Sequence, residues 1–121
     1  MSNVLRRRIV VRTQFAATHK CPSGIAKKAN TFIEDEHRHV FKVEVAVRVD
    51  SDDREVEFLA LLRDVEEWTA IRHGQSVGFS SCEHLCLDLE KHLSRLGYVV
   101  FRISVFEDGE NGAEYEWEDR V

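Results

Sequence analysis

The segment from His37 to Val49 has the strictest alternation of side-chain types in the chain. The side chains at every second position are His37, His39, Phe41, Val43, Val45, Val47 and Val49. Most of the intervening positions are polar, among them Arg38, Lys42 and Glu44. Because successive side chains of a strand point to opposite faces, this pattern predicts a long strand with one buried face.

Three further segments alternate in a similar way. They are Arg7 to Phe15, Tyr98 to Glu107 and Ala113 to Trp117. Two hairpin signals, Asp108-Gly109 and Asn111-Gly112, separate the last two of these predicted strands. Residues 16–36 lie between the first predicted strand and the strand that begins at His37. This irregular stretch contains the only proline of the chain. A loop of this length in a small domain is often functional.

The middle of the chain has helical spacing instead. Apolar residues recur every three or four positions from about Glu55 to Ile71, which predicts a helix there. A second helix is predicted to begin where Ser80 and Glu83 have the spacing of a capping box, and to end near Gly97. The order strand, strand, helix, helix, strand, strand predicts one α+β domain over residues 1–121, an antiparallel sheet with helices on one face.

The charge balance disfavours a protein that binds nucleic acid. The chain has 22 acidic and 17 basic side chains, a formal net charge of -5. Its apolar stretches are too short to cross a bilayer or to act as a secretory signal. The 3 cysteines form no CxxC pair and are expected as thiols. We therefore expect a soluble cytoplasmic protein without nucleic-acid or membrane partners.

Three histidines are candidate metal ligands. His37 and His39 project from the same face of the long predicted strand, and His19 follows the first strand. Antiparallel pairing of these strands would bring His19 close to the other two. Three or four ligands with nitrogen, sulfur or oxygen atoms suit a zinc ion. The alternative is that the histidines end a strand and form local hydrogen bonds only.

Glu107 is a carboxylate at the end of an otherwise apolar strand face. An unpaired charge there is costly, so a partner with several hydrogen-bond donors is expected. The adjacent N–H groups of a pterin or guanine ring would satisfy both carboxylate oxygens. Alternatively, the strand has reached solvent at the hairpin and Glu107 needs no ligand.

Other residues are candidates for proton transfer. Cys21 would be a nucleophile or a base if cations or a metal stabilised its thiolate. Glu34 precedes the histidine pair and is either a base near the metal or part of an acidic loop. His73, in a glycine-flanked loop, is a general base or a solvated side chain. The capping box explains Glu83 without any ligand.

Short motifs occur in one order over nearly the whole chain: FAATH, HRH, SSCEHL and VFED. Their order resembles the family of 6-pyruvoyl tetrahydropterin synthase and 6-carboxytetrahydropterin synthase. The resemblance implies that His19, His37 and His39 are zinc ligands. It also implies that Glu107 anchors the pterin ring.

The resemblance implies further features of the fold and the substrate site. A family motif at the start of the second helix corresponds to Ser81, Cys82 and Glu83, so Ser81 and Glu83 are implied substrate-binding residues. The implied fold is a T-fold, with four antiparallel strands and two helices on one face. Family subunits close into barrels as homo-oligomers, often trimers stacked as hexamers, with active sites at the subunit interfaces.

The chain departs from the family pattern mainly at catalytic positions. Arg38 replaces a glycine between the paired histidines. The family cysteine that acts as base falls near Ile33, so Cys21 would serve only if the loop folds back. A sister group uses a glutamate at the spacing of Glu34. His73 is kept from an L-D-H motif whose aspartate is lost.

The function that the resemblance implies is that of a zinc-dependent lyase acting on 7,8-dihydroneopterin triphosphate. Cys21 or Glu34 would be the base, with His73 assisting. One alternative is cleavage of the side chain to 6-hydroxymethyldihydropterin, with Glu34 as the base. Another is a catalytically silent homologue that binds a pterin, and a third is a metal-free structural module.

Overall fold

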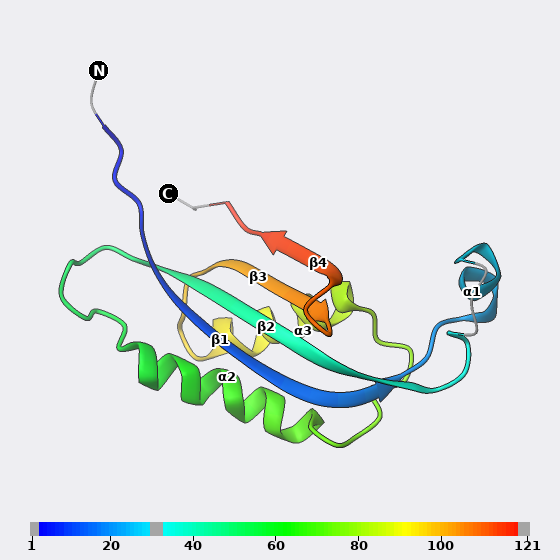
Figure 1. Ribbon diagram of the computed structural model, residues 1–121. Helices are drawn as coiled ribbons and strands as arrows, with labels where there is room; N and C mark the ends of the chain where they lie inside the picture. Colours follow the sequence, from blue (N-terminus) through cyan, green and yellow to red (C-terminus); the bar gives the residue numbers. More distant parts are fainter. Residues whose placement is uncertain (1–2, 30–32, 119–121) are drawn as a thin grey trace.

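The computed structural model describes residues 3–29 and 33–118. Figure 1 shows a curved sheet with two long helices against it and a short helix beyond the end of β1. The elements are β1 (Arg7–His19), α1 (Ser23–Ala29), β2 (His37–Val49), α2 (Phe58–Arg72), α3 (Cys82–Arg95), β3 (Val100–Glu107) and β4 (Asn111–Glu116).

The sheet has four strands in the order β1-β2-β3-β4, and each neighbouring pair is antiparallel. Both long helices lie between β2 and β3 in the chain, α2 packing against β1 and α3 against β3 and β4. Their buried side chains join a single core with one face of the sheet. This confirms the predicted α+β class and the T-fold arrangement.

The core is built on the alternating faces of β1 and β2. Phe15 and Phe41 are cross-strand neighbours, and their rings stack with centroids 5.1 Å apart. Trp68 of α2 meets the ring of Phe15 edge-on at 5.6 Å. The other buried helix side chains include Leu61, Val65, Leu85, Leu89 and Leu93. Full burial of side chains of this size stabilises the fold by about 1.5–3 kcal/mol each.

β1 is longer than its sequence predicts. Residues Ala16–His19, expected in a loop, continue the pairing with β2. The other edge of this stretch forms hydrogen bonds with residues 74–78. The Gly74 N–H donates to the Ala16 carbonyl at 2.7 Å, and the Val77 N–H donates to the Thr18 carbonyl at 2.9 Å. The side chains of this stretch are small or polar, so their alternation gave no strand signal. Pairing on both sides holds the strand instead.

The expected long loop also contains a helix. Pro22 precedes α1, and its carbonyl accepts hydrogen bonds from the N–H groups of Ile25 and Ala26, both at 3.0 Å. Proline is tolerated there because the first N–H groups of a helix have no partner within the helix. Residues 30–32, the rest of the predicted polar segment, lie outside the described residues.

The predicted start of the second helix is displaced by one residue. Ser81, not Ser80, is the N-cap of α3, and its hydroxyl accepts a hydrogen bond from the His84 N–H at 3.1 Å. Glu83 lies in the first turn, where a carboxylate is favourable beside the helix dipole. The predicted capping box of Ser80 and Glu83 is therefore wrong.

Alternation over Tyr98 to Glu107 predicts that Val99 shares a face with Ile103 and Val105, and this prediction is wrong at the beginning of the strand. Ala46 pairs with Arg102 whereas Val47 pairs with Val100, so β3 carries an irregularity between these positions. A bulge of this kind reverses which face later side chains occupy. Consequently Val100 is buried and Val99 is exposed.

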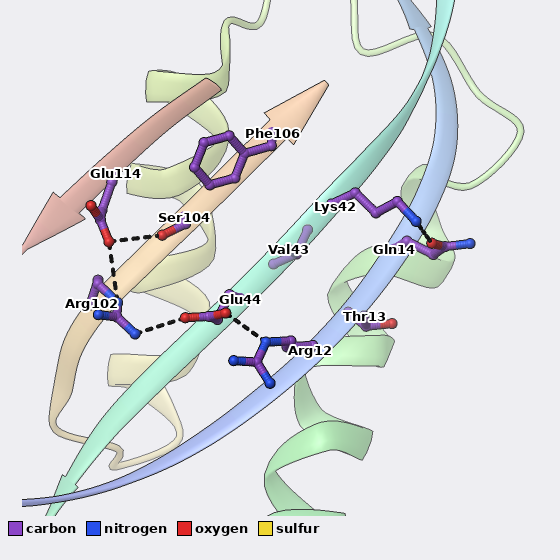
Figure 2. A pocket seen from close by; sticks show the side chains of 10 residues that line it. All are labelled: Arg12, Thr13, Gln14, Lys42, Val43, Glu44, Arg102, Ser104, Phe106 and Glu114. Atoms are coloured by element: carbon purple, nitrogen blue, oxygen red, sulfur yellow. Dashed lines mark hydrogen bonds and ion pairs between the residues drawn. The ribbon is translucent and has the colours of Figure 1, made fainter. Parts of the chain in front are cut away.

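The sheet face away from the helices carries a network of ion pairs, shown in Figure 2. Arg12 Nε donates to Glu44 Oε2 at 2.7 Å, and Arg102 Nη2 donates to Glu44 Oε1, also at 2.7 Å. Arg102 Nε lies 3.4 Å from Glu114 Oε1. Charge alternates from strand to strand across the face, so each carboxylate faces a guanidinium.

Candidate metal centre

The pairing of β1 with β2 brings the three histidines together. His19, at the end of β1, is directly opposite His37, at the start of β2, and His39 follows on the same face. The ring centroids lie 4.6 Å apart for His19 and His37, 5.2 Å for His19 and His39, and 4.9 Å for His37 and His39. The sequence-based expectation of a single histidine cluster is met in its geometry.

Each imidazole is oriented through its Nδ1 atom. Nδ1 of His19 lies 3.1 Å from the Ser80 carbonyl oxygen, and Nδ1 of His37 lies 2.8 Å from the Asp35 carbonyl oxygen. Carbonyl oxygens only accept hydrogen bonds, so both Nδ1 atoms carry the hydrogen. In a neutral ring Nε2 then presents a lone pair, which is the form that binds metals.

The third ring is oriented by a carboxylate. Nδ1 of His39 lies 2.7 Å from Asp108 Oδ2, and the Val40 N–H donates to Asp108 Oδ1 at 2.8 Å. Hydrogen bonds from Val40 and then from His39 hold the pKa of Asp108 below its ordinary value. Carboxylate-histidine pairs of this type fix ligand rings in metal sites.

A backbone turn places Asp108 at this position. Asp108 adopts φ 56°, and its N–H donates to the Val40 carbonyl at 2.7 Å. Short polar side chains such as aspartate tolerate this left-handed conformation. The sequence predicted the turn at Asp108-Gly109 but not the role of this carboxylate. The second hairpin signal is wrong, because Asn111 and Gly112 belong to β4.

Glu107 completes the cluster from the end of β3. Its Oε2 lies 2.7 Å from His39 Nε2 and 3.4 Å from His19 Nε2. His19 Nε2 is buried and has no hydrogen-bond partner among the described residues. One ligand atom from each of the three histidines and Glu107 lies within 4.8 Å of the others.

This donor set fits a zinc ion. Tetrahedral bonds of about 2.0–2.1 Å place neighbouring ligand atoms about 3.3–3.4 Å apart. Glu107 Oε2 lies 3.4 Å from His19 Nε2 and 2.7 Å from His39 Nε2, and all four ligand atoms lie within 4.8 Å of one another. Two lone pairs facing each other at 2.7 Å, as at His39 and Glu107, require a cation or a proton between them. The unpaired Nε2 of His19 has the same requirement. The cluster therefore has the composition, spacing and unsatisfied atoms of a metal centre.

The cluster opens into a cavity of about 870 Å³. The cavity is also lined by Cys21, Ser81, Glu83 and Asn111. Its apolar wall is formed by Ile25, Ile33, Phe79, Leu87 and Tyr115. An apolar cavity of this size with a few converging polar groups is typical of a small-molecule site.

Cys21 reaches this cavity because the loop folds back. The Cys21 N–H donates to the Ile33 carbonyl at 2.8 Å, so the backbone of Cys21 lies beside the position at which the family cysteine was expected, and both residues line the cavity. Cys21 is partly exposed, whereas Cys82 and Cys86 are buried. Burial and then the charge of Glu107 raise the pKa of Cys82 to about 12, and burial raises the pKa of Cys86 to about 11.

Two predicted catalytic residues lie away from the cluster. Glu34 is exposed and lines an adjoining cavity of about 590 Å³, to which Cys21 also contributes. His73 caps the end of α2, and its Nδ1 accepts a hydrogen bond from the Ala16 N–H at 3.1 Å. His73 is not among the described residues that line the histidine cavity. Within one chain the structure does not bring it to the cluster.

The comparisons with known proteins bear on the fold. No protein-family model and no curated protein matches the chain. A solved structure of 6-pyruvoyl tetrahydropterin synthase from Caenorhabditis elegans is similar, with a TM-score of 0.77 and 13% sequence identity. The match covers 98% of this chain and 100% of that one. None of the described helices has the length and hydropathy of a membrane span. The chain has the fold of a tetrahydropterin synthase.

Proposed function

We propose that this protein is a zinc-dependent lyase that acts on 7,8-dihydroneopterin triphosphate or a close pterin relative. The observation that carries the proposal is the orientation of the three imidazoles, whose Nδ1 atoms are all engaged so that Nε2 of each is left for a metal. The fold of the similar synthase and the adjoining cavity support the pterin substrate.

The roles of the residues follow from their positions in the cavity. His19, His37 and His39 would hold the ion, and Zn²⁺ supplies Lewis acidity to hydroxyl groups of the substrate side chain. Glu107 would accept hydrogen bonds from the adjacent N–H groups of the pterin ring. Ser81, at the N-terminus of α3, lines the same cavity and would contact the substrate.

Cys21 is the base that the geometry favours. It lines the histidine cavity, whereas Glu34 lines the adjoining one. In the proposed reaction the Cys21 thiolate would take a proton from a side-chain carbon and a proton would be returned to the ring, so that the side chain is oxidised to the same extent as the dihydropterin ring is reduced. The triphosphate would then leave by elimination, and no external reductant is needed. Cleavage to 6-hydroxymethyldihydropterin with Glu34 as base is the alternative reaction.

A pterin-binding protein without turnover is the second candidate function. The position of His73 favours it, because its Nδ1 is engaged with Ala16 and its ring is outside the cavity.

If His73 is catalytic, it has to reach the cavity of a second copy of the chain. We therefore include in the proposal a cytoplasmic homo-oligomer, a trimer or a hexamer, in which cavities lie at subunit boundaries.

The oligomer has support in the charges of the sheet edges. β1 and β4 are the two edge strands, and their polar-face side chains include Arg12 on β1 and Glu114 on β4. A β1 edge placed beside the β4 edge of another copy would bring basic next to acidic side chains. Such pairing also covers edges that would otherwise invite aggregation. Light scattering of the purified chain measures its mass and tests the assembly.

Mass spectrometry of the reaction products is the decisive test. Zinc-loaded protein is incubated with 7,8-dihydroneopterin triphosphate beside the variants His37→Ala, Cys21→Ser and Glu34→Gln. We expect a pyruvoyl or carboxy tetrahydropterin from the wild type and from Glu34→Gln only. Hydroxymethyldihydropterin, lost in Glu34→Gln, would assign the alternative reaction. Unchanged substrate with zinc and pterin both bound would assign the binding role.

A further inference from the structure

Phe79 is an exposed aromatic residue at the histidine cavity. It lines this cavity and also the adjoining one that contains Glu34, so it lies where the two cavities meet. Its side chain is 57% exposed, and Ile25 and Leu87, which line the same cavity, are 57% and 40% exposed. Large apolar side chains that gather in the open beside one cavity indicate a binding site for an apolar or flat partner.

The backbone on both sides of Phe79 is tied to the end of β1. The Gly78 carbonyl accepts a hydrogen bond from the Lys20 N–H at 2.9 Å, and the Ser80 carbonyl oxygen lies 3.1 Å from Nδ1 of His19. Gly78 has φ 61°, a left-handed conformation that favours glycine. The backbone that carries the Phe79 ring is therefore the same backbone that orients a metal ligand, which fixes its position relative to the metal centre.

The Phe79 ring has a cation beside it but no aromatic neighbour. Lys20 Nζ lies 4.8 Å from the centre of the ring, within the range of a cation–π contact. Phe15 in the core, by contrast, meets the rings of both Phe41 and Trp68. In the described part of the chain no other aromatic ring stacks on Phe79. Its ring is therefore available to a flat ligand.

We propose that Phe79 is a specificity-determining residue on which the flat ring of the substrate stacks. The inference rests on the proposed function, in which the metal binds hydroxyl groups on the side chain of a pterin. The ring then extends from the metal into the cavity of about 870 Å³, whose wall includes Phe79. Offset stacking of two aromatic rings is favourable beyond the apolar area that it buries.

Stacking on Phe79 also distinguishes the substrate from a tetrahydropterin product. The ring system of a dihydropterin is conjugated and close to flat. The second ring of a tetrahydropterin is puckered, because it contains two adjacent saturated carbons, and a puckered ring makes poorer contact with a flat one. Phe79 therefore holds the substrate more tightly than the product, which favours release of the product after turnover.

Two binding probes test the stacking without any turnover. They are 6-methylpterin, which is flat, and 6-methyltetrahydropterin, which has the same amino-pyrimidinone ring beside a puckered ring. Calorimetry in the absence of oxygen gives the dissociation constant of each probe with the zinc-loaded wild type, Phe79→Leu and Phe79→Tyr. Phe58→Leu is the matched control, because Phe58 is also 57% exposed and is not among the described residues that line the cavity.

We expect Phe79→Leu to weaken the binding of 6-methylpterin by about tenfold or more, and that of 6-methyltetrahydropterin by less than about threefold. Phe79→Tyr and Phe58→Leu should bind both probes as the wild type does, and all variants should keep their zinc. An equal loss for both probes in Phe79→Leu would overturn the stacking. Unchanged affinity with a smaller mass in light scattering would also overturn it and would assign the ring to a contact between subunits. No binding of either probe to the wild type would instead refute the proposed function.

Discussion

The two faces of the sheet carry polar clusters of opposite character. On the face away from the helices, Arg12 and Arg102 alternate with Glu44 and Glu114, and each charge meets its opposite (Figure 2). On the helix-covered face the histidine nitrogens converge on one another and on the Glu107 carboxylate. The first cluster is complete as it stands. The second brings together atoms that repel unless a cation lies among them.

One buried nitrogen in each cluster makes the difference concrete. Arg102 Nε and His19 Nε2 are both buried without a hydrogen bond, and each lies 3.4 Å from a carboxylate oxygen. The guanidinium is a cation beside its anion, so the approach is attractive. His19 Nε2 is an electron pair beside an anion, because the hydrogen of its ring is on Nδ1. An unsatisfied acceptor beside an anion therefore indicates a cation site, whereas an unsatisfied nitrogen of a guanidinium beside an anion does not.

Removal of one histidine should have the largest effect, on the zinc content of the protein. We expect His19→Ala to lose its zinc during gel filtration, because the buried donor of the set is gone and only His37, His39 and Glu107 remain. Glu44→Gln, on the other face, should keep one zinc per chain. Elemental analysis after gel filtration measures both contents, and a zinc-loaded His19→Ala protein would contradict the ligand assignment.

Loss of a side chain from the core between the sheet and the helices should have an effect almost as large, on the stability of the fold. Phe15→Ala removes a fully buried ring that packs on Phe41 and Trp68, so we expect the free energy of unfolding to fall by about 3–5 kcal/mol. Phe106→Ala, on the polar face, should cost about 1 kcal/mol because that ring is only partly buried. Urea unfolding measures both, and equal losses would show that the core does not lie where the structure has it.

The carboxylate behind His39 should have an intermediate effect. Asn at position 108 offers one acceptor oxygen where Asp108 uses two, so either His39 or Val40 loses its partner. We expect Asp108→Asn to lower zinc affinity by about tenfold, because loss of the hydrogen-bond partner of a metal ligand commonly weakens metal binding by at least this much. Competition with a chelator gives the affinity. The same value in Asp108→Asn and wild type would mean that His39 is oriented by packing alone.

The smallest effect is expected on the polar face. Arg12→Gln removes an exposed ion pair with Glu44, which keeps Arg102 as a second partner. We expect the free energy of unfolding to fall by about 0.2–1 kcal/mol, less in high salt, since exposed pairs are screened. Urea titrations at low and high salt test this, and a loss above 2 kcal/mol in both would show that the network is structural.

The sequence was sufficient for the α+β order of elements and for the proximity of the three histidines, because both depend on side-chain periodicity, whereas the T-fold was implied by the resemblance. Two histidines on one strand face and a third at a strand end leave few arrangements once those strands pair. Asp108 and the carbonyls of Ser80 and Asp35 were not foreseen, because turn geometry places them. Residues of every type have a backbone carbonyl, so the sequence does not indicate which carbonyl will orient a histidine ring.

The misplaced elements have a related cause. The end of β1 is held by pairing with residues 74–78, and Cys21 is brought to the cavity by a hydrogen bond to Ile33. Both contacts join segments that are distant in sequence or lie within one irregular loop. Alternation and capping rules describe local preference, so they do not report such pairings.

The link between residues 74–78 and the end of β1 also limits how other chains can approach. The backbone groups of Ala16, Thr18 and Lys20 on that edge are already bonded to Gly74, Gln75, Val77 and Gly78. An incoming strand that adds to β1 must therefore stop before Ala16. The edge next to His19 therefore has no free backbone groups among Ala16, Thr18 and Lys20 for strand addition, so aggregation through this edge would stop before residue 16.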